Sequence, residues 1–165
     1  MDAEIAAQIK GIDKLTGIFG DWPSFHDAEV IDVDLQRSPL EPERDSSLNP
    51  VLTVRIHVHK MTDEVDSRGY FVLKNHTLAT IRFYAVDEFE IDGFATQNVI
   101  FELTIKQEVR RGSGAGKDWI WNPSAPTPFF RVEFDPSTGM GGSFACRGIE
   151  VLAAVTCNER GEILA

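Results

Sequence analysis

The feature that most constrains this chain is an alternation of apolar and polar side chains at every second position. It recurs in the stretches 31–36, 52–59, 79–84 and 99–106. Successive side chains of a β-strand point to opposite faces, so this period indicates strands that bury one face and leave the other in water. Strands with one solvent-exposed face and short connections are typical of antiparallel sheets. We therefore predict a mostly β fold, either an antiparallel sandwich or a strongly curved sheet.

The N-terminal segment follows a helical period instead. Apolar residues recur at spacings of three and four between Ile5 and Leu15, and Asp2 stands where an N-cap is preferred. This predicts one short N-terminal helix that pads the sheet. Gly11 weakens the helix, and the Trp22-Pro23 step beyond it forces an extended or turning backbone.

Length and segment composition bound the organisation of the chain. The 165 residues fit within one domain spanning 1–165. No apolar run is long enough to cross a bilayer and the first residues lack the pattern of a signal peptide, so we expect a cytoplasmic protein. Cys146 and Cys157 have no Cys-x-x-Cys spacing, which gives no support to a disulfide framework, and Cys146 is expected in the core.

The charge balance restricts the partners. There are 26 acidic and 16 basic residues, for a formal net charge of −10. Such a charge repels phosphate backbones and anionic membrane surfaces, so neither nucleic acid nor a membrane is expected as a direct ligand. A basic protein would be attracted. The oligomeric state is left open by the sequence.

Two stretches place acidic residues on one face of an expected strand. The first carries Asp32 and Asp34, and the second carries Glu88, Glu90 and Asp92. The second is interpreted either as a short edge strand or as an extended acidic loop. Both are candidate partner-binding surfaces, and simple solvation of charged faces is the alternative for each.

A long segment rich in Gly, Ser and Pro, residues 110–128, carries Trp119 and Trp121. Tryptophans two residues apart share a face of an extended backbone, where they can stack a sugar or anchor a partner protein. This makes them candidate partner-binding residues and leaves a carbohydrate-binding or other small-ligand β module as one alternative function. Packing beneath the loop is the other interpretation.

The best lead toward an enzyme is the pair His57 and His59, followed by Glu64. Two imidazoles on one strand face and a carboxylate suit zinc or iron, which leaves a metal-dependent β-fold enzyme as a second alternative. The alternation places both histidines on the wet face, however, and His26 and Asp27 are neighbours that point apart in an extended segment. We therefore predict no metal, no cofactor and no catalytic residue.

The stretch Ile18-Phe19-Gly20-Asp21-Trp22-Pro23-Ser24-Phe25-His26-Asp27-Ala28-Glu29-Val30, with the alternating residues 31–35 that follow, resembles the immunity protein 50 family of bacterial polymorphic toxin systems. The likeness includes Asn98-Val99-Ile100 further along the chain. It implies a mostly β cytoplasmic protein that binds a cognate toxin and neutralises it without chemistry of its own. The charge of the chain favours a basic toxin. The resemblance carries over no particular binding residue.

Overall fold

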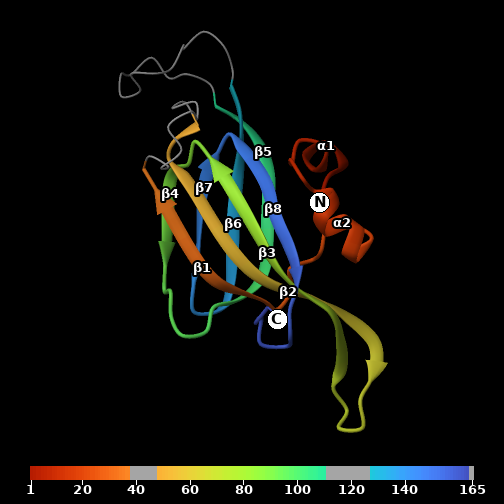
Figure 1. The fold of residues 1–165 in the computed structure, drawn as a ribbon. Helices are drawn as coiled ribbons and strands as arrows, with labels where there is room; N and C mark the ends of the chain where they lie inside the picture. Colours follow the sequence, from red (N-terminus) through yellow and green to blue (C-terminus); the bar gives the residue numbers. More distant parts are fainter. Residues whose placement is uncertain (38–47, 111–126, 164–165) are drawn as a thin grey trace.

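A computed structural model describes residues 1–37, 48–110 and 127–163 (Figure 1). Two short helices precede a run of strands that form one eight-stranded sheet. The helices are α1 (Ala3–Ala6) and α2 (Asp13–Phe19). The strands are β1 (Ala28–Gln36), β2 (Val51–Val65), β3 (Phe71–Tyr84), β4 (Asp87–Asp92), β5 (Val99–Arg110), β6 (Thr127–Thr138), β7 (Gly141–Cys146) and β8 (Gly148–Thr156).

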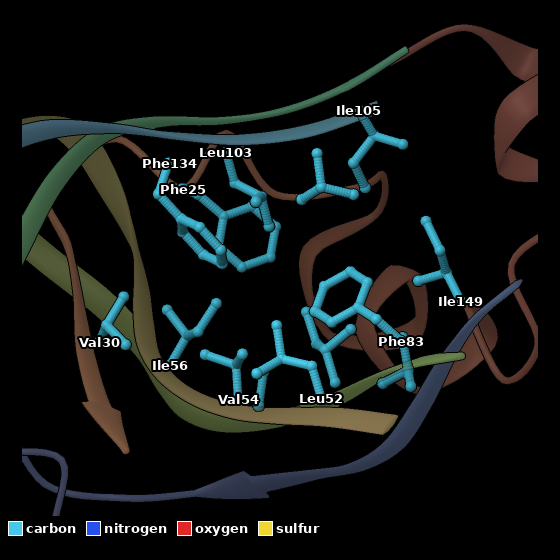
Figure 2. Packing of buried hydrophobic residues seen from close by; sticks show 14 of the residues in the cluster. Phe25, Val30, Leu52, Val54, Ile56, Phe83, Leu103, Ile105, Phe134 and Ile149 are labelled. Carbon is cyan, nitrogen blue, oxygen red and sulfur yellow. The ribbon is translucent and has the colours of Figure 1, made fainter. Parts of the chain in front are cut away.

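Within the sheet the strand order is β4-β7-β6-β5-β1-β2-β3-β8, and every neighbouring pair is antiparallel. The sheet curves around its own core. This is shown by rings from distant strands that meet: the ring centroids of Phe83 on β3 and Phe144 on β7 are 4.9 Å apart. Figure 2 shows side chains of β5 and β6 facing those of β2 and β3 across the interior. The predicted antiparallel, strongly curved β fold is confirmed.

The core consists of the inward residues of both sides of the curved sheet. Leu52, Val54 and Ile56 on β2 are fully buried, as the alternation predicts (Figure 2). Phe25 joins them from the loop before β1 and is also buried, with the Trp22 ring 5.2 Å away. The N-terminal segment contributes Ile5 of α1, Ile9 between the two helices and Leu15 of α2 to the same cluster.

Two β-bulges shift the expected alternation where β1 meets β5. The register of β1 skips Ile31 between Val30 and Asp32, and the register of β5 skips Phe101 after Ile100. In each strand the extra residue changes which side chains point inward on the N-terminal side of the bulge. Val30 and Ile100 are therefore buried, while Phe101 is 49% exposed. The expectation that Ile31 and Phe101 point into the core was wrong for this reason.

The predicted N-terminal helix is present but divided in two. The Asp2 side chain accepts a hydrogen bond from the Glu4 N–H at 2.8 Å, as expected of an N-cap. The first helix ends at Ala6, and Gly11, between α1 and α2, adopts a φ of +64° that is incompatible with one continuous helix. The preceding Lys10 pairs with edge strand β8, its N–H donating to the Ile149 carbonyl at 3.0 Å.

None of the helices in the described ranges is long and apolar enough to cross a membrane.

The β2–β3 hairpin extends beyond the rest of the sheet as a projecting arm (Figure 1, yellow). We use "the arm" for residues 60–74, from the pair Lys60↔Lys74 to the tip. At the tip the Asp66 carboxylate accepts hydrogen bonds from the N–H groups of Arg68 and Tyr70, at 2.8 and 3.0 Å. Gly69 supplies the positive φ of +89° that the turn requires.

Candidate functional site

The acidic residues of β1 lie on the outer face of the sheet, as expected. Asp32 forms an ion pair with Arg55, its register partner on β2, at 3.0 Å. The Asp34 carboxylate accepts a hydrogen bond from the Gln36 side chain at 2.6 Å. Because Asp32 is already paired with a cation, this surface carries less free negative charge than the sequence suggests.

The second acidic stretch forms β4, at one edge of the sheet. Phe89 and Ile91 pack against the core, and Glu90 and Asp92 point outward. The Glu88 carboxylate is bonded to Arg131 of β6. Within the described ranges no cation pairs with Glu90 or Asp92. Of the two interpretations of this stretch, the structure shows the short edge strand and not the extended loop.

The arm exposes a continuous apolar face that the sequence pattern did not single out. Leu73 and Phe71 are two apart on β3, so they share a face, and their register partners on β2 are Met61 and Val65. All four are exposed, and Tyr70 at the tip is 68% exposed. Apolar side chains gathered on a projecting hairpin are typical of a protein–protein contact. The sequence signal that could have indicated a hairpin here is the Asp66 to Gly69 turn, because Asp and Gly are favoured in turns.

Three histidines converge where the arm leaves the body. His57 and His59 lie on β2 and His76 on the adjacent strand β3, and one ring nitrogen from each lies within 4.8 Å of the others. His57 Nε2 is 3.0 Å from His76 Nδ1. The expectation that both β2 histidines are wet was wrong, since His57 is only 5% exposed and His59 is half-buried. Spacing rules did not indicate His76, because only strand pairing brings it to this position.

The C-terminal turn explains why His57 is buried. Gly161 lies against its ring so closely that a Cβ built there would be 3.2 Å from His57 Cβ. Burial, together with the neighbouring His76 and His59, lowers the pKa of His57 to about 4. Burial also lowers the pKa of His59, and the Asp27 charge opposes that shift. The neutral forms of His57 and His59 are therefore favoured at neutral pH.

The other residues considered for chemistry do not join the cluster. Glu64 lies on the arm and forms an ion pair with Lys74 at 2.6 Å. The alternative interpretation, in which Glu64 joins the two β2 histidines in one site, is therefore wrong. His26 and Asp27 contact each other, with Nδ1 and Oδ2 3.0 Å apart, because Asp27 has a φ of +58° and turns the backbone. The expectation that these two side chains point apart in an extended segment was therefore wrong.

Trp119 and Trp121 lie outside the described residues.

Cys146 is buried in the core as expected, and burial raises the pKa of its thiol to about 12. Such a thiol stays protonated at neutral pH and is a poor nucleophile.

Taken together, these features define a mostly β protein whose acidic edge, apolar arm and histidine cluster are its distinctive surfaces. The family model for immunity protein 50 matches residues 11–156, and the chain belongs to that family. The match includes the arm, β4 and all three clustered histidines. Searches of curated proteins and of solved structures gave no match to this chain.

Proposed function

We propose that this chain is an immunity protein that binds a cognate toxin domain and neutralises it by occlusion, without catalysis of its own. The family membership supports the class of protein. The observation that carries the binding role is the apolar face of the arm, which extends from the body into solvent (Figure 1). We also propose that residues 1–165 form a single immunity-protein-like domain.

The arm suits the centre of a protein interface. Interfaces derive most of their affinity from a few aromatic or apolar anchors that become fully buried on binding. Phe71 and Tyr70 are such side chains, and the guanidinium of Arg68 lies 5.8 Å from the Tyr70 ring centroid. A hairpin fixed by an Asp66 turn loses little conformational freedom on binding, which favours affinity.

The acidic surfaces suit the approach of a basic partner. A formal net charge of −10 attracts a positively charged toxin and accelerates encounter. Asp32 and Glu88 are held by Arg55 and Arg131, so Asp34, Glu90 and Asp92 are the candidate acids left to contribute, and the last two lie together on the β4 edge. The same edge charges also disfavour strand addition by another chain.

Coexpression tests this function. Where a large multidomain protein with a variable C-terminal toxin domain is encoded beside this chain, that toxin domain is produced in cells with and without the full chain. We expect the chain to restore growth and to copurify with the toxin. Failure to rescue, with the chain folded and abundant, would contradict the inhibitor role for that pair.

A matched pair of variants separates the function from the proposed surface. Phe71→Ser changes an exposed phenylalanine on the arm, and Phe94→Ser changes one of similar exposure between β4 and β5. Rescue should weaken with the first and persist with the second. Equal rescue by both, alongside rescue by the wild-type chain, would leave the function standing and remove the arm as the contact surface.

A further inference from the structure

We propose that His57, His59 and His76 form a binding site for one zinc-class divalent transition metal at the base of the arm. Imidazole nitrogens are common zinc ligands, and three from one protein leave a fourth position for water or another donor. The three donor atoms lie within 4.8 Å of one another, which is compatible with a shared ion after small side-chain adjustments.

The second observation is a buried nitrogen without a partner. In the described part of the chain, His59 Nδ1 is buried and has no hydrogen-bond partner. A buried polar atom left in this way costs free energy comparable to a lost hydrogen bond, so its persistence calls for an explanation. A metal ion coordinated by His59 Nδ1 would remove this free-energy cost. The His57–His76 contact alone does not, because it leaves His59 Nδ1 without a partner.

The surroundings favour a bound cation over three charged imidazoles. Each ring centroid lies 5.2 to 5.9 Å from the other two, so protonating them together would place like charges close to one another. The groups that face the cluster include Asp27, whose charge acts on His59, and His26, which is paired with Asp27. The carboxylate partly compensates the charge that a metal would introduce.

The position of the site gives it a structural consequence. His57 and His59 are on β2, His76 is on β3, and the arm begins one residue after His59. The Cys157 N–H donates to the His76 carbonyl at 3.0 Å, so the C-terminal segment is attached to the same place. A metal here clamps the two strands at the point where the arm loses the support of the core. This inference concerns metal binding and stands apart from the proposed toxin inhibition.

The test is a zinc titration of the full chain after removal of metals with a chelator. We expect saturable uptake of one zinc per chain by calorimetry. Cobalt in place of zinc should give the strong visible absorption of a four-coordinate site. Absence of stoichiometric zinc uptake by the folded wild-type chain would overturn the proposal.

Variants assign the ligands. His76→Gln and His59→Gln should each weaken zinc binding by at least about tenfold, since even indirect support of a metal ligand contributes that much. Glu64→Gln is the control, because this carboxylate lies on the arm outside the cluster and is paired with Lys74, and the variant should bind zinc as the wild type does. Circular dichroism establishes that each variant is folded. Equal affinity in all three variants would assign the zinc to another place and overturn the site.

Discussion

The two halves of the β2–β3 hairpin make an instructive contrast. In the body, the facing pair Ile56 and Ala79 is completely buried beneath the opposite side of the curved sheet. In the arm, the facing pair Met61 and Leu73 is exposed, although the same two strands continue and stay paired beyond a register shift between Val58 and Lys60. Strand pairing alone therefore does not bury a side chain. Burial requires a second layer, and the arm has none within the described residues.

This difference separates stability from recognition. Core side chains stabilise the fold through burial and close packing. Exposed apolar side chains on the arm gain nothing comparable in the free protein, which favours a role for them in binding. Each of the following predictions asks whether body and arm differ in this way.

The largest difference should be in thiol reactivity. Cys146 lies in the core, with its pKa raised to about 12, so labelling should wait for unfolding and be slowed by about 10⁴-fold or more relative to an exposed thiol. Tyr70→Cys places a thiol at the arm tip, where it should react at once. Counting labelled thiols over time by mass spectrometry measures both, and rapid labelling of wild-type Cys146 would show that the body is not closed.

Stability should depend on the body far more than on the arm. Phe83→Ala removes a fully buried ring that packs on Phe144, and it should lower the free energy of unfolding by about 3–5 kcal/mol. Phe71→Ala removes an exposed ring and should change it by less than about 0.5 kcal/mol. Urea denaturation gives both values. A loss above 2 kcal/mol for Phe71→Ala, on the scale of a buried side chain, would mean that the arm packs on something in the free protein.

Affinity should depend on the arm. With a cognate toxin in hand, Phe71→Ala should weaken binding by about 2 kcal/mol, or roughly 30-fold, if this ring is an anchor of the interface. Calorimetry or surface plasmon resonance measures the change. Phe94→Ala, at a similarly exposed position off the arm, serves as the control and should bind as the wild type does.

The smallest effect should come from the acidic edge. Glu90→Lys on β4 should slow association with a basic toxin by a few-fold at low salt and leave the dissociation rate nearly unchanged, because such charges act mainly during encounter. Glu102→Lys, an exposed glutamate on β5, is the matched control. If the association rate changes neither with salt concentration nor with Glu90→Lys, electrostatic steering is removed from the proposal.

Local sequence patterns anticipated much of the fold. The alternation in 52–58 placed four inward residues of β2 correctly, and the charged outer face of 88–92 placed an edge strand. The N-cap at Asp2 was also found. These features depend on a few consecutive residues, so a single sequence contains the information that specifies them. The motif around Trp22-Pro23 led to the family for the same reason.

The candidate sites were anticipated less completely. The acids of β1 and β4 were found from their alternation, but the pairing of Asp32 with Arg55 and of Glu88 with Arg131 joins different strands. The arm was missed because its apolar residues look the same as those of the body until one knows which part of the hairpin is covered. His57 was placed in water because the turn at Gly161 that covers it lies more than 100 positions along the chain.

The sequence by itself determined that this protein is an acidic, antiparallel β protein of the immunity protein 50 family, because side-chain period, charge and a local motif are properties of neighbouring residues. Only the tertiary structure decided which side chains are inside. Bulges at Ile31 and Phe101 reversed the facing of two strand starts, and pairing of β2 with β3 brought His76 to His57. Such outcomes depend on register and on the opposing layer, which contacts between distant parts of the chain establish.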